Sequence, residues 1–207
     1  MSSSDGRHTP DGSGVCVWLT GPSGAGKSTV TKELLPLLEK HGRTVTVLDV
    51  VDVLRKLPCE RTSEGKLLRK AFVAGEVVRH GGVAICVTVS ARRETRETAR
   101  SMIGPEQFVE VLVEAPPGVT SARKAGRNRK PSLGKRAKGA VRPLVARVAF
   151  RGRSAYEPPL APDLTIDTTS QTPADGARAI IRLLEGRGSL APVARPTEHR
   201  TEATRSA

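Results

Sequence analysis

The sequence predicts a three-layer α/β/α domain in which helices cover both faces of a five-stranded parallel sheet. Two observations support this fold class. Five short apolar runs lie along the chain, and each is nearly continuous, as in strands that are buried on both faces. Segments with apolar residues at helical spacing separate these runs, and strands that alternate with helices are typical of a parallel sheet.

The predicted elements alternate regularly along the chain. The predicted strands are residues 15–20, 44–48, 83–89, 108–113 and 164–167, and the predicted helices are residues 27–41, 63–80, 91–103 and 174–185. The first strand, VCVWLT, runs into a glycine-rich turn, the second ends at Asp49, and the third ends at Ser90. Ligands of open parallel sheets bind beyond the carboxyl ends of the strands, so functional residues are expected at these positions.

The two ends of the chain differ in composition from its middle. Residues 1–13 and 186–207 are rich in Ser, Pro, Gly and Arg, and their few apolar side chains cannot offset the entropy of ordering. We therefore expect two disordered tails around one domain, residues 14–185. The N-terminus lacks the apolar core of a signal peptide, and no stretch approaches the roughly 18 apolar residues of a membrane span. These features predict a cytoplasmic protein without a membrane partner.

Charge and cysteine usage narrow the possible functions. The formal net charge is +13, and residues 123–153 hold twelve Lys and Arg with no Asp or Glu. Outside this segment, basic and acidic residues nearly balance, so the excess charge is confined to one stretch. The three cysteines are widely spaced, and Cys16 and Cys86 fall within predicted strands, which favours packing over catalysis or metal binding.

The segment GPSGAGKS, which begins at Gly21, predicts a site for nucleotide phosphates. It matches G-x-x-x-x-G-K-S, follows a predicted strand and opens a predicted helix, as the P-loop mechanism requires. Backbone N–H groups and the helix N-terminus would surround a phosphate, Lys27 would reach the β and γ phosphates, and Ser28 would bind Mg²⁺. The predicted cofactors are ATP and Mg²⁺, and the predicted nucleotide-binding residues are Gly21, Ser23, Gly24, Ala25, Gly26, Lys27, Ser28 and Thr29.

Among P-loop proteins, a small-molecule kinase fits the sequence best. The chain has no Asn-Lys-x-Asp loop for guanine, and it is short for a motor or transporter ATPase. A small kinase needs an acceptor site, a group that orients the acceptor hydroxyl and a basic lid over the phosphates. Asp49 and Asp52 follow the second predicted strand, and residues 123–153 would supply the lid.

Several segments together resemble the adenylylsulfate kinase family, whose members phosphorylate the 3′-hydroxyl of adenosine 5′-phosphosulfate. They are residues 14–29 with the P-loop, Val47-Leu-Asp49, residues 83–97, the strand from Phe108, Tyr156-Glu-Pro-Pro and Ile166-Asp-Thr168. The resemblance covers about residues 14–185 and implies the P-loop nucleoside triphosphate hydrolase-type fold. It also implies that Arg123 corresponds to an arginine of the family's lid and contacts the nucleotide.

The departures from that family gather where it binds its acceptor. The family's Asp-Gly-Asp-Asn-Val-Arg has become DVVDVLR from Asp49. Without a gap, Val51 and Leu54 replace its second Asp and its Arg, whereas a one-residue insertion, which we favour, aligns Asp52 and Arg55 with them. The motif Asp-Arg-x-x-Asn-Ile-Arg-Arg falls on residues 62–69, where Arg69 alone matches. The donor half is therefore kept while the acceptor half is rewritten.

These observations predict an ATP-dependent kinase that phosphorylates a hydroxyl of an altered acceptor, such as a nucleoside or a specialised metabolite. The expected catalytic residues are Lys27, Asp49 and Asp52, and the expected acceptor-binding residues are Asp52, Arg55, Arg69, Ser90 and Arg93. Structural roles remain open for some of them: either Asp could cap a helix, Ser90 could be a helix N-cap, and Arg93 and Arg96 could be surface residues paired with Glu94 and Glu97.

Two alternative functions also remain open. The first is an authentic adenylylsulfate kinase of sulfate assimilation. The second is a nucleic-acid-associated P-loop protein, which is disfavoured because the basic segment holds a single aromatic residue, Phe150, on which a base could stack. We thus expect ATP and a small hydroxyl-bearing acceptor as partners rather than nucleic acid. A homodimer is compatible with the sequence, which does not fix the oligomeric state.

Overall fold

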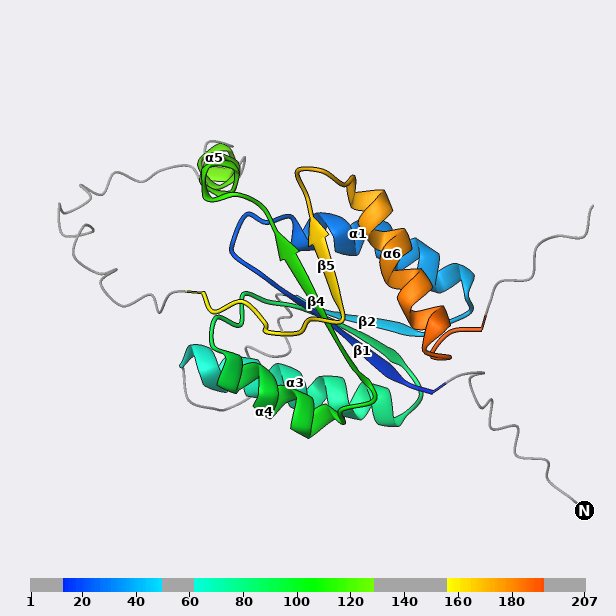
Figure 1. Ribbon diagram of the computed structural model, residues 1–207. Helices are drawn as coiled ribbons and strands as arrows, with labels where there is room; N and C mark the ends of the chain where they lie inside the picture. The colour runs from blue at the N-terminus through cyan, green and yellow to red at the C-terminus, as the bar shows by residue number, and fades with distance from the viewer. Residues whose placement is uncertain (1–12, 50–61, 129–155, 192–207) are drawn as a thin grey trace, which may run out of the picture.

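A computed structural model describes residues 13–49, 62–128 and 156–191 of the chain, and its sheet confirms the predicted fold class (Figure 1). The five strands are parallel and lie in the order β2-β3-β1-β4-β5. They are β1 (Val15–Thr20), β2 (Val45–Leu48), β3 (Val83–Val87), β4 (Phe108–Glu114) and β5 (Leu164–Asp167).

Helices cover the sheet on both faces, which gives the three layers (Figure 1). One face carries α1 (Lys27–Lys40) packed beside α6 (Pro173–Gly186), and the other carries α3 (Ser63–Arg79) packed beside α4 (Arg93–Ile103). A further helix, α5 (Pro117–Asn128), follows β4 and lies beyond the carboxyl end of that strand (Figure 1). Among the helices described, none is long and apolar enough to cross a membrane.

The alternation of side chains along each strand divides the core into two clusters. In β1, Val17 and Leu19 belong to the cluster beneath α1 and α6, whereas Cys16 and Trp18 belong to the cluster beneath α3 and α4. Trp18 lies against Phe108 of β4, with the ring centroids 5.4 Å apart. Every residue of β1 is buried, which explains why this strand appears in the sequence as an uninterrupted apolar run.

The buried cysteines serve packing, as predicted. Cys16 and Cys86 are free thiols with no solvent exposure, and their sulfur atoms lie 3.8 Å apart on neighbouring strands. Burial raises the pKa of the Cys16 thiol, which keeps it in the unreactive protonated form. Cys59 lies outside the described residues.

The structure differs from the predicted end of the domain and adds one helix that was not predicted. The expected tail from residue 186 is packed as far as residue 191: Leu190 is buried in the core cluster of α1 and α6, and Arg187 pairs with Asp163. The burial of Leu190 and the pairing of Arg187 together hold a segment whose composition resembles a tail. The helix α5 was also not predicted, and it includes the first residues of the expected lid, 123–128. The remainder of that lid, 129–155, lies outside the described residues.

Candidate functional site

The loop between β1 and α1 has a backbone conformation that glycine permits. Gly21, Gly24 and Gly26 all have positive φ angles, of 142°, 94° and 107°. A Cβ at Gly21 would lie 2.0 Å from the carbonyl oxygen of Val113, and one at Gly24 would lie 2.6 Å from that of Thr120. The loop therefore packs closely against the end of β4 and the start of α5, and side chains at these positions would push it away.

Lys27 is the first residue of α1 and folds back over the loop. Its Nζ donates hydrogen bonds to the carbonyl oxygens of Gly21 at 2.8 Å and Pro22 at 3.0 Å, and the residue is only 8% exposed. Hydrogen bonds to an anion are stronger than bonds to a neutral carbonyl, so the ammonium is placed to bind a phosphate that enters the loop. The glycine-rich backbone and Lys27 together fit the triphosphate of a nucleotide.

Two oxygen-bearing side chains meet next to this loop. Ser28, at the start of α1, directs its hydroxyl to Oδ2 of Asp49, at 3.3 Å, just after β2. Mg²⁺ prefers oxygen ligands and is usually held by one or two protein groups together with phosphates and water. Among the described residues, no group of three or more His, Cys, Asp or Glu side chains could hold a metal ion. Ser28 and Asp49 could hold Mg²⁺ together with the phosphates of the nucleotide.

The backbone of Asp49 is held by a residue that the sequence analysis missed. Lys70 of α3 donates hydrogen bonds from Nζ to the carbonyl oxygens of Asp49 at 2.9 Å and Val87 at 2.8 Å. The side chain is buried, and burial lowers its pKa. A sequence signal existed: Lys70 stands beside Ala71 and one turn before Ala74 on the buried face of the helix, where a lysine requires buried acceptors.

Arg123 of α5 reaches the P-loop, as expected of a nucleotide-binding residue. Its guanidinium donates to the hydroxyl of Thr168 at 2.8 Å and to the carbonyl oxygen of Gly24 at 3.5 Å. Thr168, which follows β5, in turn donates to the carbonyl oxygen of Ala25. An exposed cation thus stands beside the phosphate loop, although contact with a nucleotide remains a prediction.

Ser90 lies at the carboxyl end of β3, but its hydroxyl faces the protein interior. It accepts a hydrogen bond from Nε1 of Trp18 at 3.2 Å, lies 2.8 Å from the hydroxyl of Thr20, and is 2% exposed. Thr20 also contacts the phenol of Tyr156, whose pKa is raised by burial. Ser90 is therefore not the helix N-cap, a position held by Arg92, and its bonds favour a supporting role over direct acceptor contact.

Arg93 and Arg96 fasten the segment after residue 155 to the end of β3. Nε of Arg93 donates to the carbonyl oxygen of Pro158 at 2.9 Å, and its backbone N–H donates to the carboxylate of Glu157. A terminal nitrogen of Arg96 donates to the carbonyl oxygen of Glu157 at 2.9 Å. Arg93 is exposed, but its Nε donates to the protein's own backbone at Pro158 and is not free for an acceptor molecule.

The expectation that Arg96 is a surface residue was wrong. It is 2% exposed, and its Nε lies 2.7 Å from Oε1 of Glu110 in β4, while another nitrogen donates to the carbonyl oxygen of Ser90. Arg100 pairs with the same carboxylate at 3.1 Å. The overlooked signal was Glu110, an acidic residue within the apolar strand FVEVLV, because a buried carboxylate requires a buried cation.

The remaining predicted acceptor residues are only partly described. Asp52 and Arg55 lie outside the described residues, so the structure does not choose between Asp49 and Asp52 as the group that orients the acceptor. Arg69 lies on α3, half-buried. At the start of the same helix, the Thr62 hydroxyl accepts a hydrogen bond from the backbone N–H of Gly65 and thereby caps the helix.

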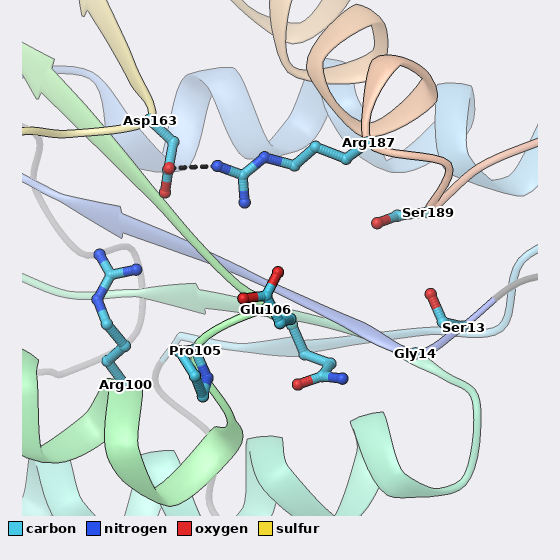
Figure 2. Close-up of a pocket in the computed structure, with 9 residues that line it drawn as sticks. Ser13, Gly14, Arg100, Pro105, Glu106, Asp163, Arg187 and Ser189 are labelled. Atoms are coloured by element: carbon cyan, nitrogen blue, oxygen red, sulfur yellow. Dashed lines mark hydrogen bonds and ion pairs between the residues drawn. The ribbon is translucent and has the colours of Figure 1, made fainter.

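A cavity of about 390 Å³ lies at the opposite, amino-terminal edge of the sheet (Figure 2). Its lining includes Arg100, Asp163 and Arg187, and Arg187 reaches across to Asp163 (Figure 2). Arg100 is paired with Glu110. Because both arginines already have carboxylate partners, we assign no ligand to this cavity.

Comparison with known proteins identifies the family to which the chain belongs. A family profile described as adenylylsulphate kinase matches residues 13–167. The adenylyl-sulfate kinase of Halothermothrix orenii is 34% identical over 189 residues, which cover 86% of this chain and 92% of that protein. That of Chloroflexus aurantiacus is 37% identical over 163 residues, which cover 75% and 81%.

A solved structure agrees with these sequence matches. The Mycobacterium tuberculosis APS kinase, determined in complex with AMPPNP and APS, superimposes with a TM-score of 0.65 at 25% identity and covers 84% of this chain and 99% of that one. The prediction of an ATP- and Mg²⁺-dependent kinase is thereby confirmed. The profile match over most of the chain, together with relatives at 34% and 37% identity, shows that this chain belongs to the adenylylsulphate kinase family.

Proposed function

We propose that this protein transfers the γ-phosphoryl group of ATP to the 3′-hydroxyl of adenylylsulfate. The observation that carries the proposal is the similarity to adenylyl-sulfate kinases over most of the chain, and the P-loop geometry around Lys27 supports it. The altered motif at residues 62–69 by itself predicts a different acceptor. The names of the relatives support the alternative, adenylylsulfate itself.

The donor site supplies position and positive charge. Phosphoryl transfer passes through a loose transition state, in which alignment and charge stabilisation contribute most of the catalysis. Lys27 contacts the loop at Gly21 and Arg123 contacts it at Gly24, so both place positive charge beside it. Ser28 with Asp49 would hold Mg²⁺, which would supply further positive charge to the phosphates. We assign Asp49 or Asp52 to orient the acceptor hydroxyl, because both follow β2.

A second acceptor remains a candidate because of the rewritten motif at residues 62–69. The positions that hold Arg and Asn in the family hold Ser63 and Lys66 here, and Lys66 is exposed on α3. A kinase with a neutral or larger hydroxyl compound as acceptor would need fewer charge-assisted contacts at this helix. If the protein has this second acceptor, adenylylsulfate should be the poorer substrate; under the main proposal it should be the better one.

The test is to compare acceptors at one fixed concentration of Mg²⁺-ATP. ADP release would be measured with adenylylsulfate, nucleosides and hydroxylated metabolites, and the product would be identified by mass spectrometry. We expect kcat/KM for adenylylsulfate to exceed that of every other acceptor by at least about tenfold. A better acceptor by the same margin would contradict the proposal. Lys27→Ala protein, purified identically, serves as the control for contaminating kinases.

A further inference from the structure

Lys70 is a cation on the buried face of a helix that otherwise contributes apolar side chains to the core. It is 8% exposed, and its neighbours Ala71 and Ala74 have no exposure. Burial of a lysine lowers its pKa and disfavours the charged form, so an apolar residue at this position would pack at lower cost. A lysine at this position is therefore expected to serve the groups to which its amine donates hydrogen bonds.

The amine holds the ends of two neighbouring strands. Its two hydrogen bonds, of 2.9 Å and 2.8 Å, end on the carbonyl oxygens of Asp49 and Val87. Leu48 of β2 is paired with Cys86 of β3, so both carbonyls lie one residue beyond the last paired position. Lys70 thus extends the connection between β2 and β3 to the point where the strands end and the candidate chemistry begins.

Asp49 is also the residue that meets the P-loop. Its carboxylate accepts from the hydroxyl of Ser28 at 3.3 Å, while its backbone is held by Lys70. A neutral amine still carries two N–H donors, so this arrangement does not depend on the protonation state of Lys70. Holding the backbone of Asp49 restricts where its carboxylate can lie, and the Ser28 contact directs it further. A metal site with few protein ligands depends on such support.

We propose that Lys70 is a positioning residue that fixes Asp49 against Ser28 and thereby strengthens the binding of Mg²⁺ with the nucleotide. This inference rests on the proposed function for the identity of the site, but it concerns the donor half alone. A purely structural Lys70 would affect the stability of the fold and leave the contribution of Mg²⁺ unchanged.

The experiment measures the affinity of the full chain for AMPPNP by calorimetry, with Mg²⁺ and with EDTA. The ratio of the two dissociation constants gives the enhancement due to Mg²⁺. For Lys70→Met we expect this enhancement to fall about tenfold, which corresponds to about 1.4 kcal/mol. Lys40→Met, which changes an exposed lysine in the last turn of α1, is the matched control and should retain the wild-type enhancement.

A double-mutant cycle shows whether Lys70 acts through Asp49. In an Asp49→Asn background, Lys70→Met should change the Mg²⁺ enhancement by less than about twofold, because the group that it positions is already lost. An equal loss in both backgrounds, or an unchanged enhancement in Lys70→Met alone, would overturn the proposal. Should Lys70→Met fail to fold, Lys70→Gln is measured against the same outcomes.

The design separates this inference from the proposed function. No acceptor is present in either titration, so the result does not depend on which hydroxyl compound is phosphorylated. Wild-type protein that shows the Mg²⁺ enhancement but does not phosphorylate adenylylsulfate would contradict the proposed acceptor alone. Normal phosphorylation together with an additive cycle would contradict the role of Lys70 alone.

Discussion

The buried ion pair between Arg96 and Glu110 gives the sharpest prediction about stability. The two side chains are 2% and 5% exposed, and the pair spans 2.7 Å between α4 and β4. Removing one partner of such a pair costs about 3–5 kcal/mol, because the other charge stays buried without compensation. Arg100 also contacts the carboxylate of Glu110, at 3.1 Å, and retains part of the attraction. We therefore expect Arg96→Met to lose about 3 kcal/mol of unfolding free energy.

The assay is equilibrium unfolding in urea, followed by circular dichroism. The midpoint should fall while the slope of free energy against urea concentration stays constant, since a similar surface is exposed on unfolding. Replacing both partners by apolar residues of similar volume is often neutral, so Arg96→Met combined with Glu110→Leu should cost less than the two single changes added together.

An exposed ion pair provides the matched control. Arg79 pairs with Glu76 at 2.8 Å on the surface of α3, with 67% of its side chain exposed. Arg79→Met should change the unfolding free energy by less than about 1 kcal/mol. A loss of less than about 1 kcal/mol for Arg96→Met, or strict additivity of the two core changes, would refute the reasoning about burial.

Three further predictions concern the site and the helix caps. Lys27→Ala should abolish phosphoryl transfer and leave the circular dichroism spectrum unchanged, because the proposed role of Lys27 is to bind the phosphates; wild-type turnover would contradict this role. Asp52→Asn should lower kcat by about 10² or more with little change in ATP affinity, as expected of a group that orients the acceptor; a larger loss of kcat in Asp49→Asn that keeps the wild-type Mg²⁺ enhancement of AMPPNP binding would move that role to Asp49. Thr172→Ala should cost about 1 kcal/mol in thermal unfolding, because its hydroxyl caps α6; an unchanged midpoint would show that the cap contributes nothing.

The strands were predictable because their burial is nearly complete. The predicted and observed strand limits differ by no more than two residues. In a parallel sheet covered on both faces, every position of a central strand excludes water, so the apolar runs mark the strands directly. The P-loop was predictable for a different reason. The backbone of one contiguous segment makes most of the contacts that a P-loop forms with phosphate, so the whole motif can be found in the sequence.

The buried cations could not be placed from periodicity alone. A charged residue on a predicted helix is normally assigned to the solvent face, and α4 is strongly polar along its length. Arg96 is buried because Glu110, on a strand that follows in the sequence, requires a cation in the core. Lys70 is buried because two strand ends offer it carbonyl oxygens. The partners of both residues come from other elements of the fold, although the position of Lys70 beside Ala71 and Ala74 was a local sign that its side chain is buried.

Recognition of the acceptor also depends on side chains that lie far apart in the sequence. The acceptor is therefore harder to assign than the donor, whose site is one contiguous motif. Each lost contact to a charged group costs about 1.5–3 kcal/mol, so the two replacements at Ser63 and Lys66 correspond to roughly 10²–10⁴ in recognition. Lys66 is itself a cation and can supply a new contact to an anionic acceptor. If adenylylsulfate is the preferred acceptor, Lys66→Ala should therefore raise the KM for adenylylsulfate. If the preferred acceptor is a neutral compound, Lys66→Ala should leave the KM for that compound unchanged. The charge at one exposed position of α3 thus distinguishes compensation for the lost contacts from a change of substrate.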